Sequence, residues 1–455
     1  MHPDALRGAR VVVAGAGVSG LAAARALLDL GARVTVTDVR PEALADLPDG
    51  AEPGAETDPL PPGTALVVTG PGRRPDHPVT RAGVPVVGET ELAWWLSAAR
   101  PEPPTWLVVT GTNGKTTTTG MLAAILLAAG RDAVACGNIG FPAVDAVRTG
   151  HRVLAVELSS FQLHWSPSIV PAAGCVLNVA EDHLDWHGSM DAYAAAKARA
   201  LTGAVAVAGV DDARAAALLA AAPAARRVGV TLGEPAEGQL GVVGGVLVDR
   251  AFGGDPVELL DADAVRPPGP PGITDALAAA ALARAHGVGP DAVRDGLTGF
   301  RPGPHRAAVV GTAAGVSFVD DSKATNPHAA AASLDAVPGP VVWIAGGLLK
   351  GASVDDLVAR HAHRLRAVVV IGTDRTEIVA ALARHAPDVP VAEVAAGDDG
   401  GMHRGPMETA VARASGLARP GDVVLLAPAA ASMDQFRDYA ERGAAFAAAV
   451  AGLAP

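Results

Sequence analysis

The stretch Val108-Val-Thr-Gly-Thr-Asn-Gly-Lys-Thr-Thr-Thr-Thr119 decides how this chain is organised. The apolar run 106–109 predicts a buried strand and residues 121–128 are typical of a helix, so the glycines lie in a strand–turn–helix unit. Such a turn directs backbone N–H groups and the positive end of the helix at one point, which suits a phosphate. Val109 stands where the GxxxxGK[ST] pattern has its first glycine, and an ordinary glycine turn with a surface lysine is the alternative. We interpret the stretch as a phosphate loop, with Lys115 at the terminal phosphates and the Thr116 hydroxyl on Mg²⁺.

Length and composition limit the remaining possibilities. The 455 residues allow about three domains, and 49% of them are hydrophobic, which is ample for large cores. The apolar runs are shorter than the roughly 18 residues of a membrane helix, and the first residues lack a signal-peptide pattern. The net charge of −12 argues against a nucleic-acid surface. Cys136 and Cys175 lie in apolar surroundings, which indicates buried free thiols, and we expect a cytoplasmic protein.

Lysine is rare in this sequence. The chain has 36 basic residues, and its lysines are Lys115, Lys197, Lys323 and Lys350. A compact ammonium, or an amine that can lose its proton and react, is what arginine does not supply. Each lysine is therefore a candidate functional residue, although Lys197, flanked by alanines on a helix that begins near Met190, could also be solvated.

Residues 10–38 form a second glycine motif. A strand precedes Gly15-Ala-Gly17-Val-Ser-Gly20, an alanine-rich helix follows, and a second strand ends at Asp38. This GxGxxG unit with its acid holds a dinucleotide in dehydrogenases, but a different diphosphate such as a UDP-sugar would use the same turn. Because the domain spans only residues 1–100 before a proline-rich joint, it has little room for a hydride-transfer site. We predict a Rossmann-like domain here.

The middle region, residues 101–302, places polar groups after its predicted strands. Asn138 lies in the loop 136–140, and Glu157 ends the strand 153–157. A carboxylate at the end of a buried strand suits a metal ligand, and a helix N-cap is the alternative. The strand 173–179 leads to His183, so we weight Glu157 and His183 as a pair. Residues 228–260 predict a β-meander, and Thr274–His286 an alanine-rich helix.

Residues 303–455 predict a third domain. Strands near 316–319, 341–345, 368–371 and 423–426 alternate with helices, which is typical of an open parallel sheet. Polar loops that carry Lys323, Lys350 and Ser432 follow three of these strands. Because ligands gather at the carboxyl ends of such strands, we expect the loops to face one cleft for an anionic substrate.

These motifs resemble those of the Mur ligases of peptidoglycan synthesis, and the resemblance covers essentially the whole chain. Its most specific carriers are Thr110-Gly-Thr-Asn-Gly-Lys-Thr-Thr117, Gly137-Asn-Ile-Gly140, Glu157-Leu-Ser-Ser-Phe-Gln-Leu163, Asp182-His-Leu-Asp185, Asp321-Ser-Lys-Ala-Thr-Asn326 and Ala431-Ser-Met-Asp-Gln-Phe436. The third and fifth of these look like the D-glutamate-adding branch of the family rather than its alanine- or diaminopimelate-adding relatives.

The resemblance implies an ATP-dependent amide ligase that joins D-glutamate to UDP-N-acetylmuramoyl-L-alanine through an acyl phosphate. It implies an α/β fold with an N-terminal Rossmann-like domain, a central P-loop ATPase-like domain with a small β-meander, and a C-terminal Rossmann-like domain. The implied ATP contacts are Gly111, Thr112, Asn113, Gly114, Lys115, Thr116, Thr117, Arg306 and Asp321. The implied substrate contacts are Gly15, Gly17, Ser19, Asp38 and Asn138, and for D-glutamate Thr325, Lys350, Ser432 and Tyr439. The implied Mg²⁺ ligands are Thr116, Glu157, His183 and Lys197 as a carbamate, and the implied catalytic residues are Lys115, Lys197, His183 and Lys323.

Two stretches depart from the family pattern. Gly269-Pro-Pro-Gly-Ile-Thr-Asp275 stands where the family often has Gly-x-His-Asn-x-x-Asn, and Leu348-Leu349 precede Lys350 where an acid and a glycine are common. No residue is an obvious base for the D-glutamate ammonium. We expect a monomer that binds neither nucleic acid nor membrane. The alternatives are another amino-acid-adding Mur ligase, an NAD(P)-dependent dehydrogenase, or a non-catalytic nucleotide-sensing module.

Overall fold

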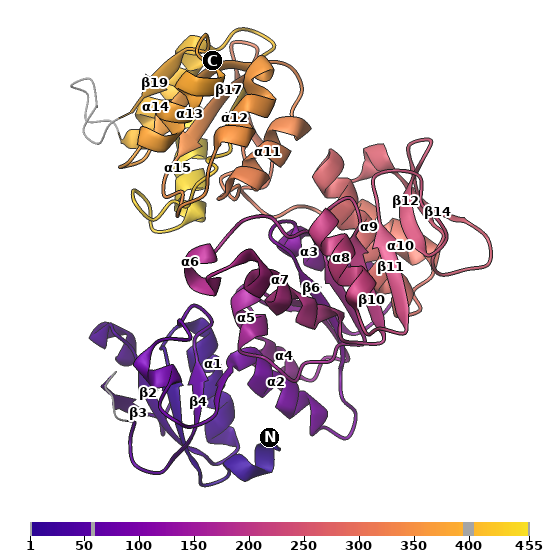
Figure 1. Cartoon of the computed structure of the whole chain (residues 1–455), viewed down its shortest axis with the longest axis vertical. Coiled ribbons are helices and arrows are strands. Elements are labelled where there is room, and N and C mark those ends of the chain that lie inside the picture. The colour runs from indigo at the N-terminus through magenta and orange to yellow at the C-terminus, as the bar shows by residue number, and fades with distance from the viewer. Residues whose placement is uncertain (1, 56–59, 395–404, 454–455) are drawn as a thin grey trace. The chain divides into compact units, whose positions relative to one another are not determined.

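The computed structural model describes residues 2–55, 60–394 and 405–453. The chain divides into two compact units. The first consists of Met1–Val179, Trp186–Ala264 and Thr274–Phe300, and the second of Ala180–Asp185, Val265–Ile273 and Arg301–Pro455. Three sheets flanked by helices make up the fold, two in the first unit and one in the second, which confirms the predicted α/β class (Figure 1). The predicted domain limits at residues 100 and 302 stay predictions.

The first sheet is fully parallel, with the strand order β3-β2-β1-β4-β5. Its strands are β1 (Arg10–Ala14), β2 (Arg33–Thr37), β3 (Glu52–Gly54), β4 (Thr64–Thr69) and β5 (Val86–Gly88), and its helices are α1 (Val18–Asp29) and α2 (Glu89–Ala98). The order reverses direction between β1 and β4, so the loops after these two strands lie together at the carboxyl edge. This edge is where we expect the first domain to bind a ligand.

The second sheet has nine strands in the order β14-β13-β12-β11-β10-β9-β6-β8-β7. The strands are β6 (Thr105–Thr110), β7 (Ala133–Gly137), β8 (Val153–Glu157), β9 (Ala173–Val176), β10 (Val205–Gly209), β11 (Arg226–Val230), β12 (Gln239–Val243), β13 (Val246–Asp249) and β14 (Val257–Asp261). The helices are α3 (Lys115–Ala128), α4 (Ala143–Thr149), α5 (Ser160–His164), α6 (Leu184–His187), α7 (Met190–Ala198), α8 (Ala213–Ala221), α9 (Pro270–Ala285) and α10 (Pro290–Gly299). The predicted meander is present as the antiparallel strands β12–β14, and it extends the parallel sheet through β11.

The sequence prediction placed the start of one helix too late. Helix α9 begins at Pro270, four residues before the predicted start at Thr274. Proline lacks only an N–H group that the first turn of a helix leaves unused, so the pair Pro270-Pro271 can begin a helix rather than delay it.

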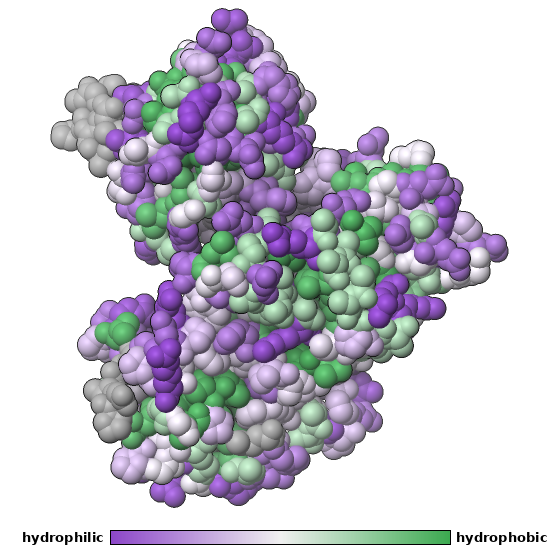
Figure 2. All heavy atoms as spheres, in the orientation of Figure 1, coloured by the Kyte–Doolittle hydropathy of each residue, from purple (hydrophilic) through white to green (hydrophobic). Residues whose placement is uncertain are grey.

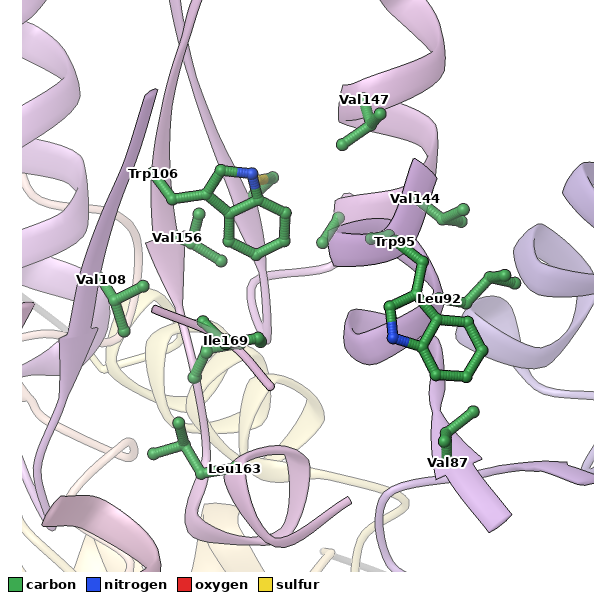
Figure 3. Close-up of a cluster of buried hydrophobic side chains, with 14 of the residues drawn as sticks. Val87, Leu92, Trp95, Trp106, Val108, Val144, Val147, Val156, Leu163 and Ile169 are labelled. Carbon is green, nitrogen blue, oxygen red and sulfur yellow. The ribbon is translucent and has the colours of Figure 1, made fainter. Parts of the chain in front are cut away.

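One continuous core joins the two sheets of the first unit (Figure 3). Val87 and Leu92 come from the end of the first sheet and from α2, whereas Trp106 and Val156 belong to the second sheet. Two indoles of this core also donate hydrogen bonds, Trp106 to Ser97 at 3.0 Å and Trp95 to Glu91 at 2.9 Å. Because the core is shared, the first sheet is held against the second by apolar packing.

The third sheet has the order β15-β16-β20-β17-β18-β19, and it is parallel except for the edge strand β15. Its strands are β15 (Ala308–Ala313), β16 (Val316–Asp320), β17 (Val341–Gly346), β18 (Leu365–Ile371), β19 (Val391–Glu393) and β20 (Val423–Leu426). Its helices are α11 (Pro327–Ala336), α12 (Asp355–His361), α13 (Thr376–His385), α14 (Pro406–Leu417) and α15 (Tyr439–Ala451). Alternate residues of β17 point to opposite faces: Trp343 packs with α11–α13, and Val342 and Ile344 with α14 and α15. The sheet is thus covered on both faces, as the sequence predicted.

Short 3₁₀ helices complete the described elements: η1 (Pro3–Leu6), η2 (Pro41–Leu44), η3 (Pro78–Thr80), η4 (Arg199–Leu201), η5 (Ala262–Ala264) and η6 (Ala362–Arg364). Weakly hydrophobic residues cover much of the visible surface around α7 and α8, where the sequence is rich in alanine (Figure 2). Among the described residues, no helix combines the length and apolar character required to cross a bilayer.

Candidate active site

The phosphate loop lies between β6 and α3, as predicted. Gly114 caps α3 with φ +86°, and a Cβ atom there would lie 2.2 Å from Asp275 Oδ1, so only glycine fits. The Lys115 ammonium folds back over the loop and donates to the carbonyls of Gly111 at 3.0 Å and Thr112 at 2.8 Å. Thr116 lies in the first turn of α3 and is half-buried, next to the buried Thr117. The helix N-terminus, the loop amides and the ammonium therefore meet at one place, as phosphate binding requires.

Two residues that the sequence analysis missed, Asn178 and Asp275, make hydrogen bonds to this loop and to the start of α3. Asn178, two residues beyond β9, accepts from the Asn113 N–H at 2.9 Å through its side chain and from the Thr112 N–H at 3.0 Å through its backbone carbonyl. The buried Asp275 carboxylate accepts from the Thr118 hydroxyl at 3.1 Å. Asp275 thus contacts the phosphate loop although the family's usual asparagine is absent there.

Lys197 is buried, with 1% of its surface exposed, so the solvated alternative is wrong. Its ammonium donates to the Gly111 carbonyl at 2.7 Å and lies 4.5 Å from the ring centroid of Tyr193. Tyr193 in turn pairs with the Thr112 hydroxyl at 3.0 Å. Lys115 and Lys197 therefore converge on the same carbonyl oxygen, from α3 and α7.

Glu157 ends β8 and is buried, with 1% of its surface exposed. Its Oε1 accepts from the Asn138 side chain at 2.8 Å, so the structure brings these two predicted residues together. Its Oε2 is buried and has no hydrogen-bond partner among the described residues. Helix α5 is capped by Ser159 in a capping box with Gln162, so the alternative interpretation of Glu157 as a helix cap is wrong. A buried carboxylate oxygen with an unused lone pair is a suitable ligand for a cation.

His183 has left-handed backbone geometry, with φ +54°, and its Nε2 lies 3.4 Å from the Asp182 carboxylate. It belongs to the second compact unit, whereas Glu157 belongs to the first, so their pairing stays a prediction. Within the described residues, no group of three or more His, Cys, Asp and Glu side chains is arranged to hold a metal ion.

In the second unit, a pocket of about 380 Å³ contains two of the predicted amino-acid contacts, Thr325 and Lys350. Its lining consists of residues 181–185, 325–326, 348–352 and 431. Leu348, one of the departures from the family pattern, pairs with Ala431 through two backbone hydrogen bonds. Ser432 is buried next to this lining.

Lys323 lies directly over the ring of Tyr439, with its ammonium 3.9 Å from the centroid, which brings two more predicted residues together. Asp321 accepts from the Ser333 hydroxyl, and burial raises its pKa to about 6, although the Arg306 guanidinium acts in the opposite direction. Arg306 and Asp321 are therefore close enough to interact, and their predicted role in ATP binding stays a prediction.

The sequence analysis also missed Arg442, which is 1% exposed. It donates to the Ser322 hydroxyl at 3.0 Å, to the Ser322 carbonyl at 2.8 Å and to the Ala430 carbonyl at 3.0 Å. Burial lowers its pKa to about 10, while Asp434 and Asp320 act to raise it. This arginine ties together the loops that carry Lys323 and Ser432. An Arg-Gly pair in a C-terminal helix gives no signal that could have identified it.

The first sheet carries its own pocket, of about 430 Å³, beside the glycine turn. Gly15 lines it, Gly17 caps α1, and Ser19 lies in the first turn of that helix. The Asp38 carboxylate accepts from the Ala16 N–H at 2.8 Å and from the backbone and side chain of Arg40 at 3.0 and 3.2 Å. Burial acts to raise the pKa of Asp38, but these hydrogen bonds and the Arg40 charge lower it below its ordinary value. Asp38 therefore stabilises the glycine turn itself.

The opposite wall of this pocket was not anticipated. It consists of residues 70–74, Asp76 and His77, which follow β4. The glycine–proline pattern Gly70-Pro-Gly72 after an apolar strand, at the same sheet edge as Gly15, was the available signal.

Family models match most of the second half of the chain and much of its middle. The Mur ligase middle domain matches residues 109–240, and the Mur ligase, glutamate ligase domain matches residues 305–430. The alanine dehydrogenase/PNT C-terminal domain matches residues 4–56, the glycine motif from which the dehydrogenase alternative arose.

The chain is similar over nearly its whole length to curated enzymes. The UDP-N-acetylmuramoylalanine–D-glutamate ligase of Nocardia farcinica is 56% identical, over 98% of this chain and 97% of that protein. Among solved structures, the UDP-N-acetylmuramate–alanine ligase of Thermotoga maritima has a TM-score of 0.58 at 19% identity, covering 95% of this chain and 98% of that one. The MurF ligase of Thermotoga maritima in complex with ADP has a TM-score of 0.56 at 17% identity, covering 99% and 96%.

Proposed function

The chain belongs to the Mur ligase family, and from that premise we propose that it is the ATP-dependent ligase that adds D-glutamate to UDP-N-acetylmuramoyl-L-alanine in peptidoglycan precursor synthesis. The observation that carries the proposal is the phosphate loop at the start of α3, where the side chains of Lys115 and Lys197 converge on the Gly111 carbonyl. The 56% identity to a D-glutamate ligase over 98% of this chain supports the choice of amino acid. The dehydrogenase alternative uses only the first glycine motif and gives these lysines no role.

The reaction is an acyl transfer in two steps. A carboxylate oxygen of the muramoyl-L-alanine attacks the γ-phosphorus of ATP, the bond to the β-phosphate oxygen breaks, and ADP leaves. The amine of D-glutamate then attacks the acyl carbon, its proton passes to solvent or phosphate, and inorganic phosphate leaves. Lys115 and the amides of Gly111–Gly114 neutralise charge on the phosphates, and Lys323 and Arg306 supply further positive charge. Water must be excluded during the lifetime of the acyl phosphate.

Magnesium is the cation we propose for this site, with Thr116, Glu157, His183 and Lys197 as its ligands. The buried Oε2 of Glu157, which has no hydrogen-bond partner among the described residues, supports this, since a cation would satisfy such an oxygen. When bound, the metal neutralises phosphate charge. Lys197 would take part as a carbamate, for which its nitrogen must first be a neutral amine that adds CO₂. Burial favours the neutral amine that adds CO₂, and the positive charge of Lys115 on the same carbonyl favours the anionic carbamate.

The substrates divide among the three proposed domains, 1–100, 101–302 and 303–455. The UDP end occupies the first-sheet pocket at Gly15, Gly17, Ser19 and Asp38, with Asn138 farther along. D-glutamate occupies the second unit at Thr325, Lys350, Ser432 and Tyr439, where the pocket offers both a cation and a hydroxyl. We further propose a cytoplasmic monomer, and its two buried cysteines fit a reducing compartment.

Phosphate release from ATP tests the proposal. The assay supplies UDP-N-acetylmuramoyl-L-alanine with D-glutamate, L-glutamate, L-alanine or diaminopimelate in separate wells. Release that requires the nucleotide substrate and D-glutamate together is the expected result. Release with another amino acid instead would show that the protein is a Mur ligase that adds that amino acid. No release with any of them, together with tight NAD(P)H binding, refutes the ligase assignment.

A further inference from the structure

The loop that follows β20, residues 427–438, crosses the carboxyl edge of the third sheet. Strand β17 lies between β20 and β18, so these two strands are not neighbours. The loop nevertheless contacts the residues directly after β18. Gln435 Oε1 accepts from the Gly372 N–H at 2.9 Å, and Asp434 Oδ2 accepts from the Thr373 N–H at 2.9 Å. Residues 427–438, which we call the crossing loop, therefore span the end of β17.

The loop that follows β17 lies against the crossing loop. Leu348 and Ala431 exchange two backbone hydrogen bonds, at 2.8 and 3.0 Å. The Gly346 N–H donates to the Pro428 carbonyl at 2.8 Å. A Cβ atom on Gly347 would lie 2.2 Å from the Ala431 carbonyl oxygen, so only glycine allows this close approach. The two backbones are in direct contact, and a shift of the crossing loop would therefore shift the loop after β17 as well.

Lys350 lies in a strained turn of the loop after β17. The backbone angle φ is +54° at Lys350 and +81° at Gly351, and the Ala352 N–H donates to the Leu349 carbonyl at 3.0 Å. Two central residues with positive φ are the pattern of a type I′ turn. The left-handed conformation is unfavourable for a residue with a Cβ atom, and it persists only where the surrounding structure holds it. The direction of the Lys350 side chain therefore depends on the contacts that hold its loop.

The amino-acid pocket of the second unit depends on the same contacts. Lys350 lines this pocket of about 380 Å³, and Ser432, in the crossing loop, is buried beside it with 3% of its surface exposed. Before Ser432 in the chain, the Ala430 carbonyl accepts from Arg442 at 3.0 Å. After Ser432, the crossing loop is held through its two side chains at the end of β18. Ser432 is therefore fixed on both sides, and loss of either anchor would move it relative to Lys350.

We propose that Asp434 and Gln435 are positioning residues for D-glutamate binding, because their side chains hold the crossing loop where Ser432 and Lys350 can contact the amino acid together. This inference deepens the proposed function and rests on it. The two side chains act through the backbone after β18 and need not touch D-glutamate. Their loss lowers the fraction of molecules in which the pocket is assembled, and the apparent affinity for D-glutamate falls by the same factor. The KM for D-glutamate should therefore rise, while the KM values for ATP and for the UDP-linked substrate should not.

Steady-state phosphate release by the full chain, with each of the three substrates varied in turn, tests this. Gln435→Leu leaves the buried Gly372 N–H without its acceptor, and we expect the KM for D-glutamate to rise about tenfold. Thr373 is exposed, so water can replace the carboxylate in Asp434→Ala, and we expect a rise of about threefold. Gln435→Glu and Asp434→Asn each keep a side-chain oxygen that can accept from the same N–H group, and they should retain the KM of the unmodified chain.

Asp374→Ala is the matched control. Asp374 is exposed on the same loop after β18 and accepts from the Thr376 N–H at 3.0 Å, a bond between that loop and the start of α13. Its loss should leave the KM for D-glutamate unchanged. An unchanged KM for D-glutamate in Gln435→Leu overturns the inference and leaves the proposed function standing, and so does an equal rise for all three substrates or in the control. If the unmodified chain releases no phosphate with D-glutamate, the proposed function fails, and the inference fails with it.

Discussion

Glu89 gives the structure a testable dependence of stability on pH. This first residue of α2 is 4% exposed, and its Oε1 accepts from the Val144 N–H, the start of α4, at 2.6 Å. Burial raises its pKa from 4.5 to about 7; the Asp145 charge adds to this, and the bond to Val144 opposes it. The carboxyl therefore joins two helices of the shared core in a form that is close to half-protonated near neutral pH.

The sign follows from proton binding. Between pH 4.5 and 7 the folded chain holds a proton that the unfolded chain has lost, so stability falls as pH rises through this window. The full loss is about 3 kcal/mol, since each pH unit in the window costs about 1.4 kcal/mol. Between pH 5.5 and 8.5 the change is about 2 kcal/mol. Glu89→Gln removes this dependence and retains a carbonyl oxygen for the Val144 N–H.

Urea unfolding of the two chains at pH 5.5 and 8.5, followed by tryptophan fluorescence, provides the measurement. When the pH is raised from 5.5 to 8.5, the unfolding free energy of Glu89→Gln should increase by about 2 kcal/mol relative to that of the unmodified chain. Glu102→Gln is the control, because Glu102 is exposed and its pair with Arg152 lies at the surface. A difference that is independent of pH, or that favours the unmodified chain more at pH 8.5, would refute the burial argument for Glu89.

Three further predictions concern the candidate site. Lys197→Arg should lower the rate of phosphate release at least about a hundredfold, since a guanidinium group cannot form a carbamate. When bicarbonate is added back to CO₂-depleted buffer, the activity of the unmodified chain should rise and that of the variant should not. Glu157→Gln should raise the Mg²⁺ concentration for half-maximal activity about tenfold or more, while ATP-independent UDP binding is retained. Arg442→Met should lower the unfolding free energy by about 2–5 kcal/mol, because the Ser322 and Ala430 carbonyls lose a buried donor, and should raise the KM for D-glutamate, with Arg442→Lys intermediate.

Much of the fold was predictable because its signals are local. The strand–turn–helix units around Gly111 and Gly15 combine apolar periodicity with glycine, and both effects act within a dozen residues. The edge strand β15 gave no such signal. None of its residues is fully buried, and among the described strands it pairs with β16 alone, so its sequence is not continuously apolar. The predicted start of α9 at Thr274 left out Pro270 and Pro271, although proline can begin the first turn of a helix.

The candidate site was predictable where residue type alone carried the chemistry. The rarity of lysine identified Lys197, and its burial against Gly111 is what a functional lysine requires. Asn178 and Asp275 were missed because each meets the phosphate loop from more than 60 residues away in the chain. Such contacts depend on strand order, and a single sequence does not give strand order. Arg442 was missed for the same reason, because its partner Ser322 lies 120 residues away in the chain.

The long cationic side chains of the site share one feature that makes anion binding compatible with the negative net charge of the chain. Lys115 donates to the carbonyls of Gly111 and Thr112, and Arg442 donates to the carbonyls of Ser322 and Ala430. A main-chain carbonyl orients such a donor but carries no net charge, so unlike a carboxylate it leaves the positive charge of the donor in place. In a partly buried site that charge is screened far less than one on the surface, and it acts over the few ångströms that matter to a phosphate. The net charge of −12 is therefore compatible with binding ATP and a UDP-linked substrate, because the local field of the loop and not the sum over the chain determines which anion binds.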